Sequence, residues 1–157
     1  MGKEIIPELK GEGFPSHLFS KKTTVISLFS AAFLGENDVQ FIAEAGVVNC
    51  LLVDIDGQNL IQLFESYGYG ICRSDVYQFI NSTSLKVNII VSDQWTGQDK
   101  KINDEYFVRL MEIASDYLVL GISQSYINII GFVPHGEYYK RSDYRGGVYW
   151  RVVNVRS

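Results

Sequence analysis

Short apolar runs alternate with amphipathic stretches along most of this chain, and this alternation constrains the fold more than any other feature. Five runs are typical of strands in their apolar, largely β-branched or aromatic content, at residues 24–29, 50–56, 71–72, 87–92 and 117–122, and the third of them is short. Amphipathic stretches typical of helices follow the first four, at residues 38–45, 58–67 and 76–80 and from Asn103 onward. Strands alternating with helices predict one α/β domain with an open, mainly parallel, doubly wound sheet.

The two ends of the chain depart from this alternation. Residues 132–142 and 148–155 are rich in aromatic and β-branched residues, and a glycine-containing turn at 143–147 separates them, which predicts a C-terminal antiparallel β-hairpin. Its aromatic residues are typical either of a sheet core or of a partner surface, so self-association is left open. Residues 1–22 hold two of the three prolines and predict an irregular leader, followed by one domain at 23–157.

Charge and hydropathy limit the classes of partner. The net charge of −4 argues against nucleic acid as a partner, because duplex binding depends on neutralising phosphates. Five basic residues near the C-terminus form either a local basic patch or a solvated hairpin face: Lys140, Arg141, Arg145, Arg151 and Arg156. No apolar run is long enough to cross a bilayer and no signal-like segment opens the chain, so we expect a cytoplasmic protein without membrane contact.

The two cysteines and two histidines suggest no chemistry of their own. Cys50 and Cys72 lie in apolar strand-like segments without metal-ligand spacing, which predicts buried structural thiols and no metal site. His17 and His135 are isolated, and no hydrolase, phosphate-loop or metalloprotease motif occurs.

Acidic residues lie at the end of the second predicted strand and just after the third. In a doubly wound sheet, ligands bind beyond the carboxyl ends of the strands where the strand order reverses. Asp54 or Asp56 is therefore placed to accept hydrogen bonds from the two hydroxyls of a ribose, although Asp56 is equally suited to cap the following helix. Asp75 suits either the amino group of an adenine or a second helix cap.

The whole arrangement resembles the S-adenosylmethionine-dependent methyltransferases of the Rossmann-like class I, from about Val25 to Val155. The resemblance is carried by the closing hairpin and by four segments after strands, at residues 29–37, 53–56, 74–77 and 91–95. It implies S-adenosylmethionine as a small-molecule cofactor, with Asp93 and Trp95 orienting the methyl acceptor and these residues binding the cofactor: Ser30, Gly35, Asp54, Asp56 and Asp75.

One departure from that family leaves two functions open. The loop at residues 30–37 has a single glycine, Gly35, where the family has two or three that let the backbone approach the methionine portion of the cofactor. One hypothesis is methyl transfer to an unidentified acceptor. The alternative is a catalytically silent Rossmann-like domain that acts as a binding or assembly module, whereas the C-terminal hairpin argues against a dinucleotide-dependent oxidoreductase.

Overall fold

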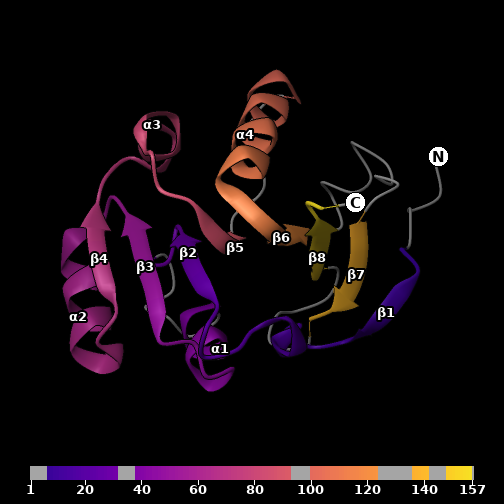
Figure 1. The fold of residues 1–157 in the computed structure, drawn as a ribbon, viewed down its shortest axis with the longest axis horizontal. Helices are drawn as coiled ribbons and strands as arrows, with labels where there is room; N and C mark the ends of the chain where they lie inside the picture. Colours follow the sequence, from indigo (N-terminus) through magenta and orange to yellow (C-terminus); the bar gives the residue numbers. More distant parts are fainter. Residues whose placement is uncertain (1–6, 32–37, 93–99, 124–135, 142–147, 157) are drawn as a thin grey trace.

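The strands of the protein form one mixed sheet. The computed structural model describes residues 7–31, 38–92, 100–123, 136–141 and 148–156. Within these residues the strands are β1 (Leu9–Glu12), β2 (Thr24–Leu28), β3 (Asn49–Asp54), β4 (Gly70–Arg73), β5 (Val87–Ser92), β6 (Ala114–Ser123), β7 (Gly136–Lys140) and β8 (Val148–Asn154). Their order in this described part of the chain is β1-β7-β8-β6-β5-β2-β3-β4, with eight strands (Figure 1).

Most neighbouring strands are parallel. The five strands β2 to β6 pair only in parallel with one another, while β8 lies antiparallel between β6 and β7. The chain runs outward from β2 to β3 and β4, and then returns to the other side of β2 to form β5. The predicted doubly wound α/β sheet with an antiparallel C-terminal hairpin is confirmed, and its order reverses at β2.

Helices cover both faces of this sheet, as the continuous apolar strands require. On one face, α1 (Asp38–Glu44) and α2 (Gly57–Tyr67) bury their apolar sides against one core cluster. On the other, α3 (Val76–Ser82) and α4 (Lys100–Ile113) bury theirs against a second cluster. Successive residues of β5 point to opposite faces, so Ile89 belongs to the first cluster and Ile90 to the second.

The N-terminal segment differs from the irregular leader that we expected. β1 pairs in parallel with β7 at the edge of the sheet, and the short 3-10 helix η1 (Ser16–Leu18) follows it. The ring of Phe14 stacks on Phe19 and Phe41 and meets the edge of Trp150. This segment is therefore held by aromatic packing and by strand pairing with distant parts of the chain, neither of which has a local signal in the sequence.

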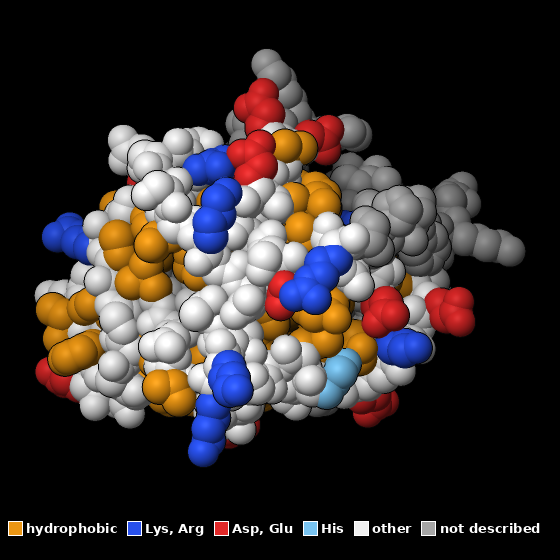
Figure 2. All heavy atoms as spheres, viewed as in Figure 1, with side chains coloured by type: hydrophobic (Ala, Val, Ile, Leu, Met, Phe, Trp, Pro, Cys, Tyr) orange, Lys and Arg blue, Asp and Glu red, His pale blue; other side chains and the backbone are white. Residues whose placement is uncertain are grey.

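The described basic residues near the C-terminus do not form an exposed patch. Arg141 and Arg151 are buried, with Arg141 over the Trp150 ring at 3.8 Å, and Arg156 pairs with Asp116. Figure 2 shows Lys and Arg side chains scattered over one face rather than gathered. Both interpretations of this segment, a basic patch and a solvated face, are wrong for Arg141 and Arg151, and Arg145 lies outside the described residues.

Two further expectations can be compared with the fold. Tyr138, Tyr139 and Trp150 are buried between the C-terminal strands and their neighbours, so the sheet-core interpretation of these aromatics is confirmed. Cys50 is buried as expected, whereas Cys72 on β4 is only half-buried, and both thiols are free.

In the part of the chain that the structure describes, no helix is long and apolar enough to span a bilayer.

Candidate functional site

The candidate site lies at the carboxyl ends of β2 and β3. β2 is hydrogen-bonded to β3 on one side and to β5 on the other, so the point where the strand order reverses is the end of β2. Asp54 is the last residue of β3, and Ser92 is the last residue of β5. In sheets of this topology, ligands bind beyond these strand ends.

The carboxylate of Asp54 is buried and holds two backbone N–H groups. Its Oδ2 accepts a hydrogen bond from the N–H of Ala31 at 2.9 Å, and its Oδ1 accepts one from the N–H of Asp56 at 3.1 Å. The Asp54 side chain therefore joins the end of β3 to the segment that follows β2. Only 7% of the residue is exposed, so most of its surface already lies against protein atoms.

Asp56 is exposed and caps helix α2. Its Oδ1 accepts a hydrogen bond from the N–H of Asn59 at 3.0 Å, which confirms the interpretation of Asp56 as a helix cap. Its other carboxylate oxygen makes no hydrogen bond with the described part of the chain. Capping therefore leaves that oxygen available to a ligand.

The backbone just after β2 adopts an uncommon conformation. Phe29 has a φ of 58°, in the left-handed region that non-glycine residues rarely occupy. The next N–H, of Ser30, donates to the carbonyl oxygen of Val53 at 3.4 Å, and the Ser30 side chain is buried. Strained backbone of this kind persists where surrounding contacts hold it, and it is concentrated at functional sites.

Asn59 belongs to the same cluster, although the sequence interpretation did not single it out. Its side-chain Nδ2 donates to the carbonyl oxygen of Ala31 at 3.1 Å. The available signal was its position three residues after the capping Asp56, in the first turn of α2. The sequence alone does not show that this turn lies beside the end of β2.

Asp75 is exposed and caps α3. Its Oδ1 accepts a hydrogen bond from the N–H of Gln78 at 3.0 Å, so the interpretation as a cap is confirmed. The preceding residue, Ser74, donates its N–H to the carbonyl oxygen of Asp54 at 2.9 Å. This bond keeps the segment after β4 beside the end of β3, and with it the carboxylate of Asp75.

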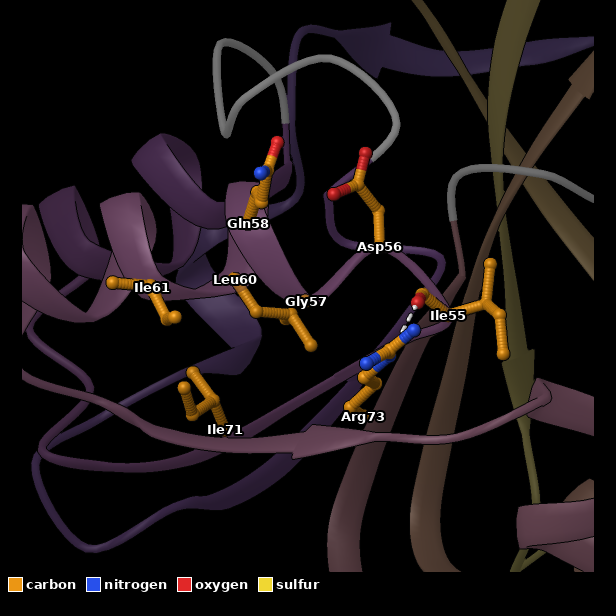
Figure 3. A pocket seen from close by; sticks show the side chains of 8 residues that line it. All are labelled: Ile55, Asp56, Gly57, Gln58, Leu60, Ile61, Ile71 and Arg73. Carbon is orange, nitrogen blue, oxygen red and sulfur yellow. Dashed lines mark hydrogen bonds between the residues drawn. The ribbon is translucent and has the colours of Figure 1, made fainter.

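A cavity of about 570 Å³ opens beside these residues, between the start of α2 and β4 (Figure 3). Its wall combines aliphatic side chains with polar ones: Ile55, Asp56, Gly57, Gln58, Leu60, Ile61, Ile71 and Arg73. In Figure 3, Arg73 turns toward Ile55, whose carbonyl oxygen accepts a hydrogen bond from Arg73 Nε at 3.3 Å. The absence of a side chain on Gly57 leaves room for the aliphatic part of the Arg73 side chain, because a Cβ on residue 57 would lie 3.0 Å from Arg73 Cδ.

Tyr106 of α4 packs into the core on the other side of the site. The residue is buried, and burial raises the pKa of its phenol, more than the neighbouring Ser92 lowers it. The phenol is therefore protonated at neutral pH and does not serve as a general base there.

Three predicted site residues, Gly35, Asp93 and Trp95, lie outside the described residues. The structure brings together Ser30, Asp54 and Asp56, and it bonds Ser74, the neighbour of Asp75 in the chain, to the carbonyl oxygen of Asp54. Among the described residues, no group of three or more His, Cys, Asp or Glu side chains is placed to hold a metal ion.

Solved structures share this fold at low sequence identity. A magnesium protoporphyrin IX methyltransferase from Synechocystis with bound SAM has a TM-score of 0.56 at 12% identity, over 84% of this chain and 68% of that one. An rRNA methylase from Streptococcus thermophilus has a TM-score of 0.58 at 11% identity, over 88% and 89%. A Streptococcus mutans protein in complex with SAH has a TM-score of 0.59 at 11% identity, over 88% and 92%.

The protein therefore has the class I, Rossmann-like fold of S-adenosylmethionine-dependent methyltransferases. No protein-family model matches the sequence, and no curated protein matches it either. The likeness is one of fold.

Proposed function

We propose that this chain binds S-adenosylmethionine across the carboxyl ends of β2 and β3 and transfers its methyl group to an acceptor beyond the end of β5. The observation that carries the proposal is the pair Asp54 and Asp56 at the carboxyl end of β3, next to the reversal of strand order at β2. Two structures with this fold, the Synechocystis methyltransferase with bound SAM and the Streptococcus mutans protein in complex with SAH, support the same class of cofactor.

The described residues fit the adenosine part of this cofactor. The carboxylate oxygen of Asp56 that does not cap α2 can accept a hydrogen bond from a ribose hydroxyl. The neighbouring side chain of Ile55 is 61% exposed, an aliphatic surface on which a flat base can pack. Asp75, beside the end of β3, can accept a hydrogen bond from an adenine amino group.

The chemistry makes few demands on acids and bases. The bound cofactor would supply a methyl group on a sulfonium sulfur, and in-line attack by the acceptor needs positioning and exclusion of water more than proton transfer. In this proposal Asp56 and Asp75 orient the adenosine, while Asp54 orders the backbone after β2. The predicted roles of Asp93 and Trp95 in orienting the acceptor belong to the same proposal.

Calorimetric titration of the full chain with S-adenosylmethionine and S-adenosylhomocysteine tests the proposal. We expect both to bind, and Asp56→Asn to weaken them about tenfold, because asparagine still caps a helix but replaces one acceptor oxygen with a donor. Glu65→Gln removes the same charge from an exposed position on the same helix and is expected to bind as the wild type does. Absence of binding at millimolar ligand would overturn the proposal.

A catalytically silent binding or assembly module is the second candidate function. It is favoured by the engagement of both Asp54 oxygens within the protein and by the single glycine in residues 30–37. A chain that binds neither S-adenosylmethionine nor its demethylated product would fit this second function.

A further inference from the structure

Four residues at the carboxyl ends of β2 and β3 are joined in a closed circuit of hydrogen bonds. The N–H of Ala31 donates to Oδ2 of Asp54, and the N–H of Asp56 donates to Oδ1 of the same carboxylate. The N–H of Asn59 donates to Oδ1 of Asp56. The side-chain amide of Asn59 then donates to the carbonyl oxygen of Ala31, which closes the circuit.

This circuit holds the backbone of one residue, Ala31, through both its N–H and its carbonyl oxygen. Ala31 lies beyond the end of β2, yet its N–H is bonded to Asp54 and its carbonyl oxygen to Asn59. The residue is 1% exposed, so water does not supply either partner. The direction of the chain as it leaves β2 is therefore set by side chains from β3 and α2.

The position of Ala31 gives the circuit a functional meaning. If the ribose lies at Asp56 and the acceptor beyond β5, the methionine portion of the cofactor must cross the end of β2, because β2 lies between β3 and β5. We infer that Asn59 is a positioning residue, which holds the carbonyl oxygen of Ala31 so that the backbone at this residue faces the methionine portion of S-adenosylmethionine. This inference rests on the proposed function.

Asn59 can be changed without disturbing the helix that carries it. It is the third residue of α2, where an acidic side chain is favourable to the helix dipole. Asn59→Asp therefore preserves α2 but cannot donate to the Ala31 carbonyl oxygen, and Asn59→Ala removes the donor without adding a charge. Gln62→Glu, an exposed amide-to-acid change one turn further along α2, is the matched control.

Two ligands separate positioning from a general structural role. S-adenosylhomocysteine carries the amino-acid portion, whereas 5′-methylthioadenosine shares the adenosine but lacks that portion. We expect both Asn59 variants to bind S-adenosylhomocysteine on the order of three- to tenfold more weakly, with 5′-methylthioadenosine affected less than about twofold. Gln62→Glu is expected to change neither affinity.

An equal loss of affinity for both ligands, or no loss for either, would overturn the inference. If the wild type binds neither ligand, the proposed function fails, and the assignment of Asn59 to the cofactor fails with it. Hydrogen exchange without ligand distinguishes that case from a failure of the circuit. Asn59→Ala is expected to lower the protection of the Ala31 amide, because freeing the Ala31 carbonyl loosens the backbone that the Ala31–Asp54 bond holds, and unchanged protection would show that Asn59 does not hold the Ala31 backbone.

Discussion

The hydroxyl of Ser27 donates a 2.6 Å hydrogen bond to Oδ2 of Asp38, and this bond joins β2 to the start of α1 inside the protein. Both residues are buried, so the carboxylate depends on protein donors rather than on water. The bond therefore fixes the start of α1 against β2.

Ser27→Ala is expected to lower the free energy of unfolding by about 1–3 kcal/mol, because it removes one donor to a buried carboxylate. Urea unfolding followed by circular dichroism measures the change. Ser115→Ala is the matched control, since the Ser115 hydroxyl donates to Asp116 at an exposed position. Equal losses in the two variants would show that burial of the Ser27–Asp38 bond does not matter.

Arg109→Lys is expected to destabilise the protein by about 1–2 kcal/mol. The Arg109 guanidinium donates to the carbonyl oxygen of Ile80 at 2.6 Å and to that of Thr83 at 2.8 Å, at the C-terminal end of α3. A lysine has a single ammonium group and cannot donate to both carbonyl oxygens with the same geometry. Arg156→Lys, at an exposed ion pair with Asp116, is expected to change stability by less than about 0.5 kcal/mol in the same urea experiment.

Gly136→Ala is expected to destabilise the sheet by about 1–3 kcal/mol through overpacking. A Cβ on Gly136 would lie 2.3 Å from Nε of the buried Arg151. Gly11→Ala on the neighbouring strand β1 is the control, because its Cβ would meet Tyr139 at an ordinary 3.4 Å. Thermal unfolding of the two variants tests the difference, and a Gly136→Ala protein as stable as the wild type would contradict the geometry.

Stability is expected to fall as the pH rises above 10, and Tyr69 contributes to that fall. Burial raises the pKa of Tyr69 from 10.0 to about 12, and its hydroxyl donates to the carbonyl oxygen of Val47 at 2.6 Å. Between pH 10 and 12 the unfolded chain therefore loses a proton that the folded protein retains, which favours unfolding. Tyr69→Phe should make the slope of stability against pH shallower, and an unchanged slope in urea titrations would rule this out.

The two cysteines are expected to differ in reactivity. Burial, together with the nearby Asp38, raises the pKa of the Cys50 thiol, and little of the residue is exposed. Cys72 on β4 is half-buried. Mass spectrometry after brief treatment with iodoacetamide should find the label at Cys72 in the folded protein and at both cysteines in urea. Labelling of Cys50 at the same rate as Cys72 under native conditions would disprove this.

Local sequence signals predicted the central part of the fold well. The run of β-branched residues predicted β5 with its observed bounds, and Asp56 and Asp75 cap the starts of helices as capping rules indicate. The start of α4 was predicted at Asn103 but lies at Lys100, since an asparagine can also lie within a helix. Elements with strong periodicity and a cap were thus the predictable ones.

For the candidate site, the sequence predicted which residues lie at the ends of strands but not how their side chains contact one another. The sequence places Asp54 after a strand, but its hydrogen bond to Ala31 joins residues 23 positions apart and depends on how β2 and β3 pair. The contribution of Asn59 depends on the same tertiary contact. Neither of these two hydrogen bonds to Ala31 can be predicted from the local sequence, because both depend on how β2, β3 and α2 pack together.

The pairing of β1 with β7 has a consequence for the order of synthesis. β1 is near the start of the chain, and its partner β7 emerges from the ribosome only after nearly all the other strands. At about 5–20 residues per second, translation leaves the first strand without its neighbour for several seconds or longer. The β1 edge of the sheet is therefore completed only after β2 to β6 have been synthesised.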